Sequence, residues 1–283
     1  MVQRTIKKQT SRRIGLFFQY AGCIIVAIIF LFPFVYMVLN SFAGDDTEIL
    51  SMSPSLFPTH WDIKNYLIAF KNMNYLRSLG NTLLIMVPVI ILNMLGSLLA
   101  AYGFARYNGK LKNFLFGILV SSMMLPWVVT MVPSFVMFKY LGWVGTRLPL
   151  IIPAFGGSAY NIFMMRQFIM SIPRDLDEAA KIDGCSEVGI LFKIILPNMK
   201  PVLVTLLIFL FTSMWSDYIG PSIYLLKEDQ YTLSLALLQL NSGYTAQWRY
   251  TLAGSTLFAM PVAILLFCLQ DYFIGNSMES AIK

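Results

Sequence analysis

The sequence has 283 residues, of which 57% are hydrophobic and 12% are charged. An ordinary soluble domain carries about 25% charged residues, so this composition excludes a typical water-soluble globular protein and indicates a membrane protein. The formal net charge of +7 would also fit nucleic-acid binding, but no polar segment is long enough to form a basic, water-exposed domain. We therefore expect no nucleic-acid partner.

Hydrophobic runs of roughly twenty residues are long enough to cross a bilayer as helices. The first run exceeds the roughly 7 to 15 apolar residues of a signal-peptide core, so we interpret it as a retained anchor. We predict one six-helix transmembrane domain over residues 15–273, between an N-terminal segment 1–14 and a C-terminal tail 274–283. The six predicted spans are 15–39, 81–103, 114–138, 149–168, 202–225 and 252–273.

Lysine and arginine are distributed unequally between alternate connections. Most of the 21 basic residues fall in the N-terminal segment, in the connections after the second and fourth spans, and at the C-terminal end. Cytoplasmic loops of membrane proteins carry this excess of basic residues. The asymmetry predicts cytoplasmic N- and C-termini, a long outer loop over residues 40–80, and a cytoplasmic loop over residues 169–201.

Proline and glycine interrupt the third and fourth spans. Pro126 and Pro133 lie in the third, and Pro153 is followed by Gly156 and Gly157 in the fourth. We expect these residues to kink the helices or to let neighbouring helices approach closely.

The cytoplasmic loop has the signals of two short helices. Pro173 suits the first turn of a helix, and the acidic residues after it favour a helix N-terminus. Gly184 suits the left-handed conformation that ends a helix, and Ser186 suits the cap of a second helix that stops at Pro197. We also expect i,i+4 ion pairs between Arg174 and Glu178 and between Asp177 and Lys181.

The apolar residues of the second predicted helix share one face, which is expected to lie against the bilayer or neighbouring helix ends; they are Val188, Leu191, Phe192 and Ile195. The first helix would then project, with Ala179 and Ala180 forming a flat patch suited to insertion into a groove of another protein. The spacing alone leaves a solvated connector as the alternative.

The stretch "EAAKIDGCSEVGILFKIILP" resembles the EAA motif of inner-membrane permease subunits in binding-protein-dependent ABC importers. The matching positions are Glu178, Ala179, Ala180, Gly184, Ile194, Leu196 and Pro197. The resemblance implies a type I ABC importer (MetI-like) permease fold with a cytoplasmic coupling helix. The residues expected to couple to the ATPase are Arg174, Glu178, Ala179, Ala180, Asp183 and Gly184.

Further segments, such as "FMMRQFIMSIPRDLDEAA" and "TLAGSTLFAMPVAILLFCLQDYF", resemble the carbohydrate-uptake branch, in particular permeases similar to the maltose-system G subunit. The implied partners are a second permease subunit of different sequence, two cytoplasmic ABC ATPase subunits, an extracytoplasmic solute-binding protein, membrane lipid, and a sugar or oligosaccharide substrate. The implied location is a bacterial or archaeal inner membrane. The resemblance also implies that ATP and Mg²⁺ bind the ATPase. Consistently, this chain has no G-x-x-x-x-G-K-[ST] phosphate loop, and its three cysteines have no metal-ligand spacing.

Polar and aromatic residues of the fourth and fifth spans are candidates for the sugar path, because sugars bind through hydrogen bonds and ring stacking; they are Tyr160, Asn161, Ser213, Trp215 and Asp217. Ser216 stands where the carbohydrate branch usually has Asn. An ion-coupled secondary transporter is the alternative, with Asp217 as its intramembrane acid. A catalytic site is not expected, since the only histidine, His60, lies outside the predicted spans.

Overall fold

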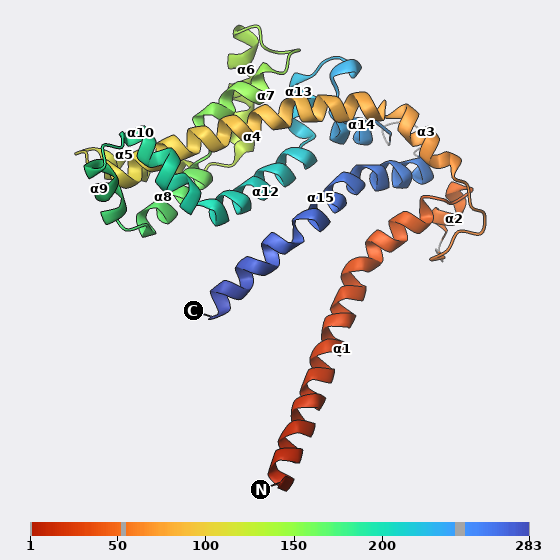
Figure 1. Cartoon of the computed structure of the whole chain (residues 1–283). Coiled ribbons are helices and arrows are strands. Elements are labelled where there is room, and N and C mark those ends of the chain that lie inside the picture. The colour runs from red at the N-terminus through yellow and green to blue at the C-terminus, as the bar shows by residue number, and fades with distance from the viewer. Residues whose placement is uncertain (1, 52–54, 241–246, 283) are drawn as a thin grey trace. The chain divides into compact units, whose positions relative to one another are not determined.

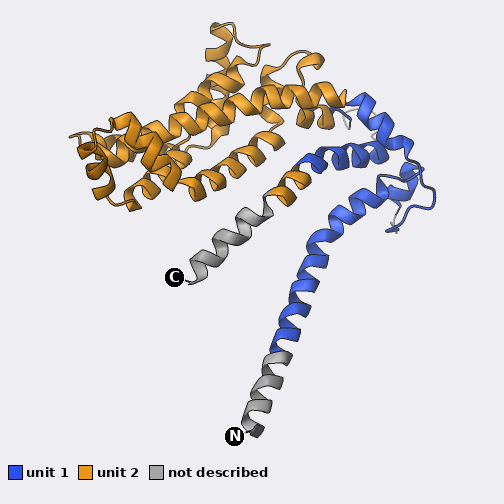
Figure 2. Ribbon diagram, viewed as in Figure 1, with its two compact units in different colours: residues 1–73, 239–261 blue, residues 74–238, 262–283 orange. Residues whose placement is uncertain are grey.

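The computed structural model describes residues 2–51, 55–240 and 247–282, with side chains over 15–51, 55–240 and 247–268. The side chains of the predicted terminal segments 1–14 and 274–283 therefore lie outside the described residues. The described elements are helices, apart from an isolated antiparallel bridge between Ala43 and Trp61. The chain divides into two compact units, residues 1–73 with 239–261 and residues 74–238 with 262–283 (Figure 2).

Unit 1 contains α1 (Val2–Asn40), α2 (Asp46–Leu50), α3 (Lys64–Asn72) and the first part of α15 (Trp248–Ile282). The buried Asn65 amide donates hydrogen bonds to the carbonyls of Ser41 and Ala43, each at 2.9 Å. The Arg249 backbone N–H donates to Asp46 Oδ1 at 2.9 Å. The expected outer loop is therefore held by hydrogen bonds within itself and to the start of α15.

Unit 2 is built along α4 (Tyr75–Arg106), which packs against α8 (Ala159–Ser171) and α12 (Lys200–Ser216) (Figure 1). Its other helices are α5 (Lys112–Ser122), α6 (Trp127–Tyr140), α7 (Leu148–Ile151), η1 (Ile152–Gly156), α9 (Asp175–Ile182), α10 (Glu187–Ile190), η2 (Leu191–Ile195), α11 (Leu196–Asn198), α13 (Ile219–Tyr224), η3 (Glu228–Gln230) and α14 (Leu233–Leu240), whose end crosses into unit 1.

Small residues allow α4 to touch the η1 segment. A Cβ atom on Gly96 would overlap the Phe155 carbonyl, and one on Gly157 would come within 2.7 Å of Ser97 Oγ. Gly157 also has φ +72°, a conformation that favours glycine. The close approach expected near Pro153 is therefore confirmed.

The described residues contain four helices that are long and apolar enough to cross a membrane, and six spans result if each of two bent pairs counts as one. The four helices are Gly15–Asn40, Tyr75–Arg106, Leu148–Ser171 and Trp248–Cys268. The pairs are Lys112–Ser122 with Trp127–Tyr140, bent by 98°, and Glu187–Asn198 with Lys200–Ser216, bent by 80°. The larger number equals the six predicted spans, but the second pair includes residues 187–198, which were expected in the cytoplasmic loop.

Two predicted spans are not continuous helices. The third span is broken rather than kinked, because extended backbone at Pro126 separates α5 from α6. The fifth was expected to reach residue 225, but α12 ends at Ser216 because Asp217 adopts extended backbone before α13.

One hydrophobic core lies between the second half of α4 and residues 162–206. Its fully buried members include Met165, Ile169, Ile190, Ile195 and Met199. Burial of a large aliphatic side chain stabilises the fold by about 1.5–3 kcal/mol. This core fixes the segment 172–199 to one end of unit 2, beside the C-terminal end of α4 (Figure 1).

Candidate functional site

Helix α9 begins with the acidic residues that the sequence analysis identified. Arg174 is its N-cap residue, and Asp175, Asp177 and Glu178 lie in its first turn, where the positive end of the helix dipole stabilises carboxylates. Pro173 precedes the N-cap and is not in the first turn, so that detail of the prediction is wrong.

Helix α9 ends at a glycine whose backbone conformation explains the residue type. Gly184 has φ +78°, and its N–H donates to the Lys181 carbonyl at 3.0 Å. The Cys185 N–H reaches back to the Ala180 carbonyl at 2.9 Å, as in glycine-terminated helix ends. A Cβ atom at Gly184 would have no neighbour within 4 Å, so the backbone, and not packing, requires glycine. The predicted left-handed turn is confirmed.

Ser186 caps the second helix as predicted, because its Oγ accepts a hydrogen bond from the Gly189 N–H at 3.2 Å. The helix does not stop at Pro197, however. It continues from α10 through the π-helical turn η2 into α11, which ends at Asn198. A π turn widens the helix, and this widening accommodates the proline that would clash in a regular α-helix.

Neither predicted i,i+4 pair of α9 is among the ion pairs of the described side chains, and Asp177 and Lys181 pair with residues outside α9 instead. Asp177 Oδ2 is 2.6 Å from Arg106 Nε at the end of α4, and their side chains are 12% and 8% exposed. Arg106 also donates to the Ile172 carbonyl at 3.1 Å. A long-range, nearly buried pair therefore joins α9 to α4.

A second connection joins the two short helices to α4. Lys181 Nζ lies 2.7 Å from Glu187 Oε1, and the Tyr102 hydroxyl donates to Glu187 Oε2 at 3.0 Å. The hydrogen bond and the negative charge of Glu187 raise the pKa of Lys181 above its ordinary value. Lys181 is therefore held as a cation between α9 and α10.

The exposed surface of α9 differs from the predicted patch. Ala179 is exposed, whereas Ala180 is 7% exposed and packs in the core, so the expected pair of exposed alanines is wrong. Ile182 is 87% exposed, although the sequence analysis did not select it. Its only sequence signal is an aliphatic residue between two charged ones. The other predicted coupling residues are exposed: Arg174, Glu178, Asp183 and Gly184.

The buried face of the second helix also differs in part from the predicted one. Leu191 and Ile195 are buried, but Val188 and Phe192 are 65% and 42% exposed. Ile190 is fully buried in their place. The buried residues therefore define a face that is rotated from the predicted one.

A second candidate site is a hollow of about 480 Å³ that is lined by residues of α6, α7, η1, α12 and α13, here named the α12–α13 hollow. It contains Ser213 and Asp217, two of the five predicted sugar-path residues. Its other polar and aromatic lining residues are Trp127, Thr130, Ser134, Phe138, Ser216 and Tyr224. The sequence analysis named Ser216 only as a departure from the carbohydrate branch and did not select the others.

The other three predicted path residues are not among the described residues that line the α12–α13 hollow. Asn161 is 3% exposed and donates to Asn93 Oδ1 at 2.7 Å. Trp215 is 3% exposed and stacks on Phe211 with ring centroids 5.6 Å apart. Tyr160 lies on α8 and is 41% exposed. Asn161 and Trp215 therefore contribute to helix packing in this structure.

The side chain of Asp217 binds backbone N–H groups. Its Oδ1 accepts hydrogen bonds from the N–H groups of Ile219 and Gly220, each at 3.1 Å. These groups belong to the first turn of α13, which lacks earlier carbonyl partners. The carboxylate therefore stabilises the start of α13 at the edge of the hollow.

The described residues contain no group of three or more His, Cys, Asp or Glu side chains that could hold a metal ion. His60 is exposed, and its Nδ1 lies 3.4 Å from Glu48 Oε1 in unit 1. This arrangement is an exposed loop contact.

Comparison with known proteins gives matches over most of the chain. Residues 92–275 match a family described as "Binding-protein-dependent transport system inner membrane component". The chain is 31% identical over 265 residues to the "Arabinooligosaccharides transport system permease protein AraQ" of Halalkalibacterium halodurans, which covers 93% of this chain and 94% of the relative. It is 32% identical over 267 residues to the "Probable starch degradation products transport system permease protein AmyC" of Thermoanaerobacterium thermosulfurigenes, covering 92% and 94%.

The structure is also similar to a chain in the crystal structure of a bacterial ABC transporter involved in the import of the acidic polysaccharide alginate. The TM-score is 0.79 and the sequence identity is 23%, with 93% of this chain and 98% of that chain covered. At this identity, the likeness shows a shared fold.

Proposed function

Because the chain belongs to the family of binding-protein-dependent transport system inner membrane components, it is a membrane permease subunit, and we propose that its transporter imports a sugar or an oligosaccharide. Its fold is the expected type I ABC importer permease fold. The carbohydrate substrate is supported by relatives that are described as permeases for arabinooligosaccharides and for starch degradation products. The chain is a transport component and not an enzyme.

The exposed surface of α9 is the observation that carries the coupling role. Glu178, Ala179, Ile182 and Asp183 present charge and one large aliphatic side chain to solvent at one end of unit 2. A helix with an exposed apolar anchor and a polar rim suits insertion into a groove of another protein. We assign this groove to a cytoplasmic ATPase subunit, on which ATP and Mg²⁺ bind.

The opposite side of α9 supplies a rigid connection to the membrane domain. The Arg106–Asp177 ion pair and the buried Ala180 hold the helix against α4 and its core. When the ATPase subunits close on ATP, their movement of α9 would pass through these contacts to α4. Arg106 is the last residue of α4, a candidate span, so this route leads directly into the membrane.

The solute path requires partners, because one chain supplies only part of a channel wall. An extracytoplasmic solute-binding protein would deliver the sugar, and a second, different permease subunit would supply the other wall. In this chain we assign sugar contacts to Ser213 and the aromatic rings of Trp127 and Tyr224 in the α12–α13 hollow. Hydrogen-bonding groups beside aromatic rings suit a polar ligand that has apolar ring faces.

The proposed location is the inner membrane of a bacterial or archaeal cell, with both termini in the cytoplasm. The distribution of lysine and arginine supports this orientation. It places the coupling loop, residues 169–201, on the side where ATP is available.

Uptake by the complete transporter tests the energy source. Cells or vesicles with maintained ATP and collapsed proton and sodium gradients should continue to import radiolabelled oligosaccharide. The ATPase subunits should co-purify with the parent chain. Loss of uptake at constant ATP would favour the ion-coupled alternative. Continued uptake with the gradients collapsed and ATP hydrolysis blocked would contradict both mechanisms.

A further inference from the structure

A second hollow lies at the C-terminal end of α4, away from the α12–α13 hollow. It has a volume of about 550 Å³ and is lined by residues between 100 and 115, from the last turns of α4, the connection after it, and the start of α5. We name it the α4–α5 hollow. Because α4 is a candidate span that ends at Arg106, this hollow lies at a membrane surface.

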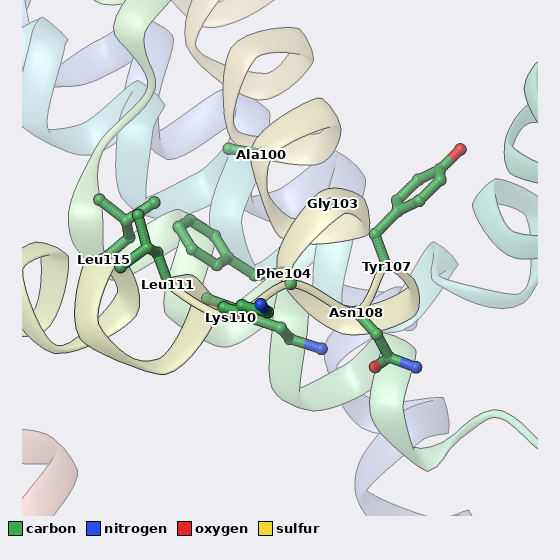
Figure 3. Close-up of a pocket in the computed structure, with 10 residues that line it drawn as sticks. Ala100, Gly103, Phe104, Tyr107, Asn108, Lys110, Leu111 and Leu115 are labelled. Atoms are coloured by element: carbon green, nitrogen blue, oxygen red, sulfur yellow. The ribbon is translucent and has the colours of Figure 1, made fainter.

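The inner wall of the α4–α5 hollow is apolar. Ala100 and Phe104 contribute from α4, and Leu111 and Leu115 contribute from the other side. Figure 3 shows the Phe104 ring directed toward the two leucines. Leu111 and Leu115 are 64% and 49% exposed, so this wall is open to a flexible apolar ligand such as an acyl chain.

The rim of the same hollow is cationic. Lys110 and Lys112 line it, and none of the described lining residues is acidic. Among the side chains that the structure describes, neither lysine forms an ion pair. Arg166 and Arg174 lie close enough for their charges to act on the Lys112 ammonium, and Arg166 Nε donates to the Phe104 carbonyl at 3.3 Å. The rim therefore has an unneutralised positive charge.

From this juxtaposition we infer that the α4–α5 hollow is a binding site for an anionic phospholipid, with an acyl chain along Phe104, Leu111 and Leu115 and the headgroup phosphate beside Lys110 and Lys112. Basic pockets at the membrane surface attract anionic headgroups, and each lysine there strengthens the attraction. A zwitterionic lipid also offers a phosphate, but its own cation offsets that charge, so the two ammonium groups attract an anionic headgroup more strongly.

The bound lipid would give the end of α4 a fixed environment. Tyr107 follows Arg106 directly and lies on the rim, so the headgroup would sit next to the residue that holds α9 through Asp177. The anionic lipid would therefore stabilise the position of α9 as well as the end of α4. This role goes beyond transport and does not depend on which solute is carried.

Lipid retention tests the site without measuring uptake. The complete transporter, expressed with its partner subunits, is reconstituted in vesicles of equal amounts of phosphatidylglycerol and phosphatidylcholine, extracted in mild detergent, and analysed by native mass spectrometry. The variant Lys110→Gln/Lys112→Gln should retain phosphatidylglycerol with about tenfold or more lower occupancy than the parent. The matched control Lys193→Gln/Lys200→Gln removes the same charge from exposed positions outside the hollow and should retain it like the parent. Equal retention by both double variants would overturn the inference.

A crosslinking measurement keeps the test decisive if the lysine variant assembles poorly. Benzoylphenylalanine introduced in place of Leu115, with both lysines intact, should crosslink to phosphatidylglycerol on illumination of the complete transporter. A crosslink to another protein subunit would show that protein covers the hollow and would overturn the inference. A crosslink to phosphatidylcholine in preference to phosphatidylglycerol would overturn the anionic specificity.

Discussion

Arg106, the last residue of α4, and Asp177, in the first turn of α9, form an ion pair with 2.6 Å between Nε and Oδ2 and with both side chains largely shielded from water. The two residues are far apart in the sequence, although Asp177 has two basic residues, Arg174 and Lys181, much nearer in the chain. The pair joins a candidate membrane span to the helix that we assign to ATPase coupling.

Replacing one residue of this pair should lower membrane abundance and uptake more than replacing both residues. Arg106→Gln or Asp177→Asn leaves the other charge buried and unpaired, which costs about 3–5 kcal/mol, whereas the double variant leaves no net charge behind. We expect each single variant to lose membrane abundance and uptake, and the double variant to recover part of both. The measurement is a double-mutant cycle on abundance, ATPase co-purification and uptake.

The exposed pair between Arg77 and Asp229 is the matched control. Its atoms are 3.3 Å apart, with side chains 62% and 48% exposed, and such pairs contribute about 0–1 kcal/mol. Arg77→Gln should therefore have little effect. Additive losses in the Arg106–Asp177 cycle would mean that the two residues act independently.

Gly184 should tolerate no Cβ atom, although space is available. Gly184→Ala places an L side chain at φ +78°, at a cost of about 1–2 kcal/mol, and should alter the end of α9. We expect lower ATPase co-purification. Gly117→Ala is the control, since it also has free space but lies within α5 without a positive φ. Equal behaviour of the two variants would contradict the role of backbone conformation.

Ile182 should be a major contact with the ATPase. Ile182→Ala removes an aliphatic side chain that is 87% exposed and contributes little to this chain's own core. An interface hot spot contributes about 2 kcal/mol or more, so ATPase co-purification should fall about thirtyfold while membrane abundance is unchanged. Ile63→Ala, at a position 70% exposed in unit 1, should leave co-purification at the parental level. Unchanged binding by the Ile182 variant would remove this residue from the interface.

Glu178→Ala should separate coupling from folding. Glu178 is exposed and forms no ion pair among the described side chains, so its loss should not lower membrane abundance. We expect reduced substrate-stimulated ATP hydrolysis and uptake at matched abundance, because the carboxylate is available to a basic group of the ATPase. Parental coupling in this variant would indicate that α9 uses other contacts.

The substitutions Asp217→Asn and Asp217→Ala distinguish helix capping from a charge requirement. Asn caps helices about as well as Asp, whereas loss of a cap costs about 0.5–2 kcal/mol. If Asp217 serves the first turn of α13, the Asn variant should transport like the parent and the Ala variant should be impaired. Uptake at matched abundance is the measurement. Equal loss in both variants would show that the negative charge itself is needed.

The orientation is tested by labelling Cys185, which is partly buried beside α10, in a Cys23→Ser/Cys268→Ser background. A membrane-impermeant thiol reagent should spare Cys185 in intact cells and react in inverted vesicles after removal of the ATPase. Reaction from outside intact cells would reverse the proposed topology.

The sequence by itself determined the features that depend on neighbouring residues. Hydropathy predicted six apolar segments, because the cost of placing a residue in lipid is a local property. Gly184 and Ser186 predicted the end of one helix and the start of the next, because a positive φ and a capping hydroxyl act within one turn. The EAA-like spacing predicted the family that the comparison then showed.

The tertiary structure decided the features that depend on which elements meet. Asp177 pairs with Arg106 and Lys181 with Glu187, although local spacing favoured pairs within α9. Ala180 is buried while its neighbour Ala179 is exposed, because the core of α4 and α8 covers only one side of α9. A helical period predicts that two faces exist, but only long-range packing selects the face that is removed from water, because that choice depends on residues distant in the chain.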